Sequence, residues 1–133
     1  MNGPNRNWNF LCWNVRGINS DAKWNAIRHK IEESSCSIFC LQETKREFFY
    51  MAYVKKFCPR RFDKFAFALS RGVSGGIFVG WNSARFGGSV EQQTDHALVI
   101  KFTACLNSAP FFSSQCLWSF VWTRKRCLCA MDE

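Results

Sequence analysis

The chain has 133 residues, of which 47% are hydrophobic and 17% aromatic, and its formal net charge is +8. This composition excludes a disordered chain, and no apolar run reaches the roughly 18 residues of a membrane-spanning helix. The length suits one domain or part of one. Because Met1–Asn9 contains no apolar signal region, we expect a protein of the nucleus or cytoplasm and not a secreted one.

The first elements form a strand–helix–strand unit. Apolar runs at Trp8–Trp13 and Ser37–Leu41 predict two strands, and the stretch between them predicts a helix that ends at about Ser34. The two strands of such a unit lie side by side and parallel. Their carboxyl ends would therefore bring Asn14 and Glu43 together at the sheet edge where open α/β sheets bind ligands.

The predicted helix has a clear start and a clear apolar face. Ser20 or Asp21 can cap its first turn, since both side chains accept hydrogen bonds from backbone N–H groups. Trp24, Ile27 and Ile31 follow the i, i+3, i+7 spacing of a buried stripe.

The remaining elements follow in order. Glu47–Phe57 predicts a second helix, and Phe62–Leu69 predicts a strand. The glycine-containing segment Ser70–Gly76 predicts a hairpin turn, after which Gly75–Trp81 returns as a strand. Ala97–Thr103 predicts a further strand.

One carboxylate and one amide oxygen, as at Glu43 and Asn14, are ligands for a hard cation such as Mg²⁺ that keeps most of its waters. Other interpretations stay open for each residue taken alone. Asn14 can close a turn through side chain–backbone hydrogen bonds, and Glu43 can be a capping or surface acid.

Basic residues concentrate between positions 45 and 71, where eight Lys and Arg face two acids, a balance of +6 in 27 residues. Their mixture with Phe, Tyr and Pro suits contact with a phosphate backbone, and a solvated helix face plus a basic loop is the alternative. The candidate nucleic-acid contacts are Lys45, Arg46, Lys55, Lys56, Arg60 and Arg61.

The eight cysteines do not have the spacing of a zinc site. Cys12 and Cys40 lie within apolar strands and are interpreted as small core residues.

Three segments together resemble a known family: Trp13–Asn19 (WNVRGIN), Leu41–Lys45 (LQETK) and Gly75–Asn82 (GGIFVGWN). They are similar to the start of an endonuclease/exonuclease/phosphatase domain of the DNase I-like fold. The likeness is greatest to the endonuclease of plant non-LTR (long interspersed element) retrotransposons. It covers residues 8–103.

The resemblance implies an α/β (α+β) fold, the N-terminal half of a four-layer DNase I-like α/β sandwich with one mixed sheet and flanking helices. It also implies a hydrolase that cuts phosphodiesters with Mg²⁺ or Mn²⁺, and DNA as partner. Glu43 would be a metal ligand, Asn14 would ligate or orient the metal, and Lys45 and Arg46 would touch the DNA backbone. No obligate protein partner is expected.

The later motifs of the family are absent from the chain. There is no Asp-x-Asn, and no Tyr-x-Pro follows the Gly75–Trp81 strand. Thr94-Asp95-His96 mimics the family's terminal motif, but it comes too soon after Glu43. We interpret it as an ordinary strand entry after a turn at Gln92–Gln93, and not as a catalytic Asp95–His96 pair.

These observations predict an incomplete domain over 8–103 and a divergent tail over 104–133, with a strand-like Cys116–Trp122. With half of the fold missing, the inner face of the sheet would be uncovered, which predicts marginal stability and self-association. Whether the chain is an enzyme stays open, and we expect no activity alone. The alternative is a small basic nucleic-acid-binding protein without catalysis.

Overall fold

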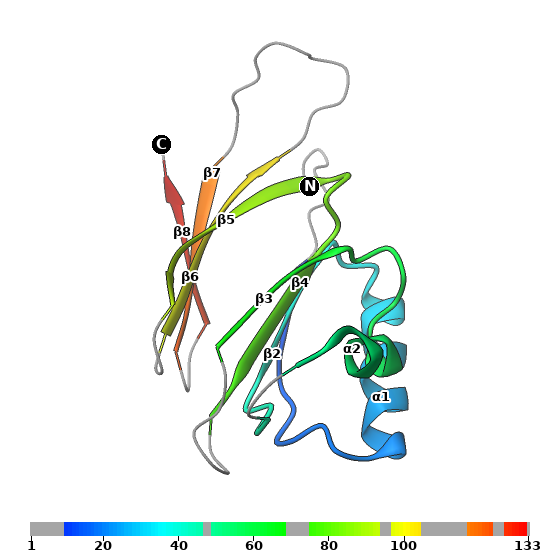
Figure 1. The fold of residues 1–133 in the computed structure, drawn as a ribbon. Coiled ribbons are helices and arrows are strands. Elements are labelled where there is room, and N and C mark those ends of the chain that lie inside the picture. The colour runs from blue at the N-terminus through cyan, green and yellow to red at the C-terminus, as the bar shows by residue number, and fades with distance from the viewer. Residues whose placement is uncertain are drawn as a thin grey trace.

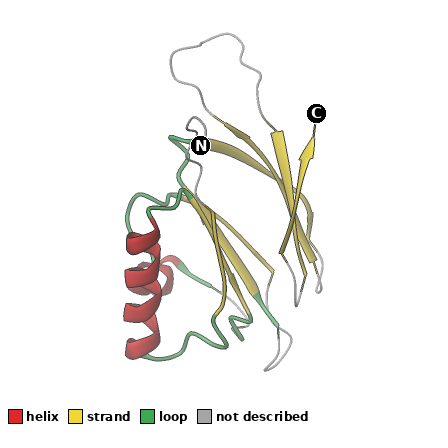
Figure 2. Cartoon of the chain, turned by 180° about the vertical axis from the view of Figure 1, so that it is seen from behind, coloured by secondary structure: helices red, strands yellow, loops and turns green. Residues whose placement is uncertain are grey.

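A computed structural model describes residues 10–46, 49–68, 75–93, 97–104, 117–123 and 127–132. The described elements form three layers (Figure 1). Two helices cover one face of a four-stranded sheet, and a second four-stranded sheet packs on its other face, as the reverse view in Figure 2 also shows. Neither described helix is long and apolar enough to cross a membrane.

The first sheet has the strand order β1-β2-β4-β3. Strand β1 (Phe10–Asn14) runs parallel to β2 (Ile38–Gln42), as predicted for a strand–helix–strand unit. Strand β4 (Ile77–Trp81) is antiparallel to both β2 and β3 (Lys64–Ala68). The mixed sheet with flanking helices that the sequence predicts is therefore confirmed.

Helix α1 (Asp21–Ser34) follows the sequence prediction closely. Of the two candidate caps, Ser20 is the one used, because its side chain accepts from the Lys23 N–H at 3.2 Å. Ile27 and Ile31 are fully buried, and Trp24 is partly buried. Helix α2 (Met51–Phe57) begins later than expected, since Phe49 and Tyr50 are not helical.

The second sheet has the order β5-β6-β7-β8 and was only half predicted. Strand β5 (Phe86–Gln93) pairs with β6 (Ala97–Ala104). The expected turn at Gln92–Gln93 is wrong, because these two residues pair with Val99 and Leu98 as the end of β5.

The tail joins this sheet. Strand β7 (Leu117–Thr123) pairs with β6, and β8 (Cys127–Asp132) pairs with β7. Residues 104–133 thus contribute strands to the same sheet as β5 and β6, although their sequence carries no family motif.

The described residues form two apolar cores, and one of them lies between the two sheets. Ile38, Val79 and Trp81 of the first sheet pack against Phe86, Ile100 and Phe102 of the second. The expectation of an uncovered inner face is therefore wrong, because β5 and β6 cover it.

The other core lies between the first sheet and the helices. Ile27, Phe57 and Phe78 are completely buried there, with Phe39 and Phe62 in edge-to-face contact at 4.9 Å between ring centroids. Cys40 is buried as predicted, but Cys12 is exposed on the edge strand β1, so its assignment to the core is wrong.

Candidate functional site

Asn14 and Glu43 meet at the carboxyl edge of the first sheet. Asn14 is the last residue of β1 and is in register with Gln42, the last residue of β2. Glu43 follows directly, and the Asn14 Nδ2 donates a hydrogen bond to Glu43 Oε2 at 3.2 Å. The predicted encounter of these two side chains is confirmed, and both are at least partly open to solvent.

Backbone hydrogen bonds hold the Glu43 loop between two neighbouring loops. On one side, the Gly17 N–H donates to the Glu43 carbonyl at 2.7 Å. On the other side, the Thr44 N–H donates to the Gly76 carbonyl at 3.1 Å, and the Lys45 N–H donates to the Gly75 carbonyl at 2.9 Å. The three predicted motif segments therefore converge on one place.

Several residues at this edge have a positive φ angle, a backbone conformation that residues other than glycine rarely adopt. The φ angles of Arg16, Glu43 and Lys45 are 56°, 59° and 59°, and Gly75 and Gly76 are also positive. A left-handed conformation costs a residue other than glycine about 1 kcal/mol or more. Such strain persists only where the surroundings impose it, and it concentrates at functional sites.

Thr44 adds a second unfavourable feature. Its side chain is completely buried, and its Oγ1 finds no hydrogen-bond partner among the described residues. A buried hydroxyl without a partner costs about 1–3 kcal/mol. The loop that carries Glu43 is thus held in place against its local preferences.

Trp24, Arg46 and Tyr53 form a cluster behind the site that links the loop after β1 to the loop after β2. The Tyr53 hydroxyl donates to the Ile18 carbonyl, and the Trp24 Nε1 donates to the same carbonyl at 2.7 Å. The Arg46 guanidinium lies 3.6 Å above the Tyr53 ring and donates to Asn19 Oδ1 at 3.3 Å. Residues after β1 and residues after β2 are thereby bound to α2.

The oxygen atoms of Asn14 and Glu43 fit an ion such as Mg²⁺ that takes few of its ligands from the protein. The Glu43 carboxylate and the Asn14 amide offer oxygens at one exposed edge, and Mg²⁺ commonly takes one or two carboxylates and otherwise keeps water. Within the described residues, no three His, Cys, Asp or Glu side chains gather as a potential metal site.

The predicted basic contacts divide between two places. Lys45 and Arg46 lie beside Glu43, and Lys45 is exposed whereas Arg46 stacks on Tyr53. Arg61 lies at the other end of β2, because its guanidinium donates to the carbonyl of Cys36 and pairs with Glu32 at 2.8 Å. A five-residue strand such as β2 spans about 16 Å.

The other predicted contacts extend along α2 and the turn that follows. Lys55, Lys56 and Arg60 are exposed, and the Lys56 ammonium lies 4.8 Å from the Trp24 ring centroid. Asp95 and His96 lie outside the described residues.

The sequence analysis did not predict the cluster of Trp24, Arg46 and Tyr53 that links the two loops. Trp24 was assigned only to a buried stripe, and Arg46 only to a DNA contact. The signal available was an interrupted aromatic run, Phe48 to Tyr53, directly after the Glu43 motif.

Comparison with known proteins supports the fold. A scan of protein-family models gave no match, and neither did a search of curated proteins. Among solved structures, the chain is similar to the AP endonuclease LMAP from Leishmania major, with a TM-score of 0.54 and 21% sequence identity.

The match covers 72% of this chain and 35% of that enzyme, so the chain spans about a third of the enzyme's length. At this identity the likeness establishes architecture. The chain has part of a DNase I-like α/β fold, as its sequence predicts.

Proposed function

We propose that this chain is related to metal-dependent DNA-cutting phosphodiesterases and does not catalyse the reaction by itself. The observation that carries the proposal is the Asn14–Glu43 pair at the carboxyl edge of two parallel strands. The strained loop around Glu43 and the fold shared with an AP endonuclease support it.

In this proposal Glu43 and Asn14 would hold a Mg²⁺ or Mn²⁺ ion. When bound, such an ion would neutralise charge on a phosphate and supply an activated water. The chain's own residues do the positioning: Asn14 orients the Glu43 carboxylate by its hydrogen bond, and Lys45 presents a positive charge beside it.

Binding of Mn²⁺, followed by electron paramagnetic resonance, tests the pair without requiring activity. We expect Glu43→Gln to weaken Mn²⁺ binding about tenfold or more, since it removes the charged ligand. Glu33→Gln is the matched control, because Glu33 is an exposed acid on α1 away from this edge. Equal binding by both variants would refute the proposed ion site.

Activity is expected to be absent because groups for acid–base catalysis are missing from the recognised motifs, and each such group contributes about 10²–10⁴-fold. Incubation of the pure protein with supercoiled plasmid and Mg²⁺ tests this. We expect no nicked product. Nicking that disappears in Glu43→Ala would contradict the proposed absence of catalysis.

The motifs WNVRGIN and LQETK further support descent from a plant non-LTR retrotransposon endonuclease. The resemblance to this family ends near Thr103, which supports a frame-shifted or newly spliced tail. Genomic sequence downstream tests this origin. Another reading frame there should encode Tyr-x-Pro and Asp-x-Asn motifs, and their absence would refute the frame shift.

A second function, nucleic-acid binding without catalysis, is favoured by the exposed Lys45, Lys55, Lys56 and Arg60. It predicts salt-dependent DNA binding that survives Glu43→Ala. Neutralising Lys55, Lys56, Arg60 and Arg61 together should weaken binding and reduce its salt dependence, as measured by fluorescence anisotropy. Binding that depends on Glu43 instead would favour the first function.

A further inference from the structure

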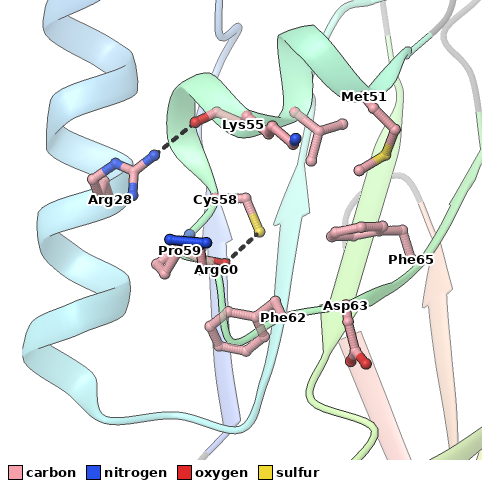
Figure 3. Close-up of a pocket in the computed structure, with 10 residues that line it drawn as sticks. Arg28, Met51, Lys55, Cys58, Pro59, Arg60, Phe62, Asp63 and Phe65 are labelled. Carbon is pink, nitrogen blue, oxygen red and sulfur yellow. Dashed lines mark hydrogen bonds between the residues drawn. The ribbon is translucent and has the colours of Figure 1, made fainter.

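A hollow of about 560 Å³ opens between α2 and the start of β3, and it includes neither Asn14 nor Glu43 (Figure 3). Lys64 at the start of β3 is in register with Trp81, which in turn pairs with Ile38 at the start of β2. The segment that leads into β3 therefore lies at the edge of the sheet opposite the Asn14–Glu43 pair. Hollows of this size hold small organic ligands in many proteins.

The walls of the hollow are largely apolar. Val54, Cys58 and Phe62 are buried in its lining, and Phe65 is partly buried. Met51 also lines it, yet 51% of its surface is exposed. A flexible, exposed methionine beside an aromatic ring is a common feature of adaptable apolar binding surfaces.

The thiol of Cys58 adds no charge to these walls. It donates a weak hydrogen bond to the Pro59 carbonyl at 3.5 Å, and burial raises its pKa to about 12. The thiol is therefore neutral over the whole physiological range.

Among the described residues, the hollow is also lined by three cations, Arg28, Lys55 and Arg60. The Arg28 Nη2 donates to the Lys55 carbonyl at 2.7 Å, which fixes the guanidinium beside α2. Lys55 and Arg60 are exposed and also line the hollow. In Figure 3, Arg28 lies on one side, and Met51 and Phe65 lie together on the other.

Asp63 is the one acid among the described lining residues, and its carboxylate already accepts hydrogen bonds from another residue. Asp63 accepts hydrogen bonds from the Ser83 N–H at 2.9 Å and from the Ser83 hydroxyl at 2.6 Å. The described part of the lining thus contains three cations and one carboxylate, and that carboxylate is hydrogen-bonded to Ser83.

We propose that this hollow binds an amphipathic organic anion, with a carboxylate or sulfonate head at Arg28, Lys55 and Arg60 and an apolar body against Met51, Phe62 and Phe65. The charges complement such a head, and the apolar walls suit a hydrocarbon or aromatic body better than a nucleobase. A nucleobase has polar edges that would need partners, and burying them without partners is costly. The site is independent of the proposed phosphodiesterase ancestry.

Fluorescence titration with anilinonaphthalene sulfonate, with decanoate as competitor, tests the proposal on the full chain. We expect saturable binding of one probe per chain, displaced by decanoate. Replacing Lys55 and Arg60 together by Gln should weaken probe binding about tenfold or more, because charge-assisted contacts are lost. Lys45→Gln, an exposed cation at the opposite edge, is the matched control and should leave binding unchanged.

A second variant, Met51→Ser, tests the apolar wall and changes only an exposed side chain. It should weaken binding of the probe and of decanoate alike. Binding unchanged in both the Lys55/Arg60 variant and Met51→Ser would overturn the proposal. Displacement of the probe by a nucleoside monophosphate as effectively as by decanoate would also overturn it, in favour of a nucleotide site. Glu43→Gln should leave probe binding intact, which separates this test from that of the ion site.

Discussion

At the scale of single residues, Asp63 shows how an exposed carboxylate joins distant parts of the chain. It lies just before β3, and both of its oxygens accept hydrogen bonds from Ser83 in the turn after β4. These hydrogen bonds hold the pKa of the Asp63 carboxyl below its usual range. Its charge therefore stabilises the fold more than it stabilises the unfolded chain.

The sign of the pH dependence follows from this lowered pKa. The contribution of Asp63 is complete above the unfolded pKa of about 3.9 and is lost as the pH falls through the lower folded pKa. We expect Asp63→Ala to melt at a lower temperature than the natural chain at pH 7. The difference should shrink as the pH falls below about 4.

Thermal melts by circular dichroism over this pH range measure the effect. Ser83→Ala removes the other partner and should show the same convergence at acid pH. A difference between Asp63→Ala and the natural chain that stays constant down to low pH would contradict a role for the charge.

The candidate site also shows what single residues reveal in a sequence. Asn14 and Glu43 were predictable as a pair because parallel strands convert two positions along the chain into one place in space. The stacking of Arg46 on Tyr53 was not, because it depends on where α2 begins and on how the loop before it turns. Side-chain geometry of this kind requires the tertiary structure.

At the scale of elements, helix α2 acts as the support for both loops of the site. Its Tyr53 is buried and touches the loop after β1 through Ile18, while Arg46 from the loop after β2 lies on the ring. The helix has only seven residues and no side-chain cap at its start. Its position therefore depends on these tertiary contacts more than on its own propensity.

Removal of the Tyr53 hydroxyl tests this support. We expect Tyr53→Phe to lower the free energy of unfolding by about 1–2 kcal/mol, since the Ile18 carbonyl loses one of its two donors and the ring stays in place. In the natural chain the same loops carry Asn14 and Glu43, so Mn²⁺ binding should weaken several-fold as well.

Tyr50→Phe is the control, because Tyr50 is 53% exposed. Urea unfolding gives the stability, and paramagnetic resonance gives the binding. A stability loss without any change in Mn²⁺ binding would show that α2 supports the fold and not the site.

At the scale of the whole molecule, the second sheet decides whether this short chain closes its core. The sequence predicted β1, β2, β3 and β4 from apolar runs, but β5 escaped because Phe86–Gln93 is polar and rich in glycine. One of its two glycines, Gly88, lies where the second sheet approaches Trp81 of the first sheet too closely for a Cβ atom. The prediction of an uncovered inner sheet face failed because β5 was not predicted. The predicted marginal stability rested on that uncovered face, so it loses its physical basis.

Gly88 of β5 lies against the Trp81 ring of the first sheet. A Cβ atom added there would lie 2.5 Å from the Trp81 ring of the first sheet and 3.1 Å from the Phe102 ring. The Trp81 ring cannot easily move, because the residue is only 5% exposed and its ring packs edge-to-face on Phe102, with 5.1 Å between the ring centroids. We expect Gly88→Ala to destabilise the protein by about 1–3 kcal/mol, the usual cost of overpacking a core.

Gly87→Ala is the matched control, since Gly87 is the neighbouring residue in the same strand. Among the described residues, a Cβ there would meet only the Thr103 carbonyl oxygen, at 4.0 Å. Urea unfolding followed by tryptophan fluorescence measures both variants. If the sheets pack as described, Gly88→Ala unfolds at lower urea, whereas Gly87→Ala stays near the natural chain. Equal behaviour of the two would mean that the second sheet does not close over Trp81, and the core between the sheets would then have to be abandoned.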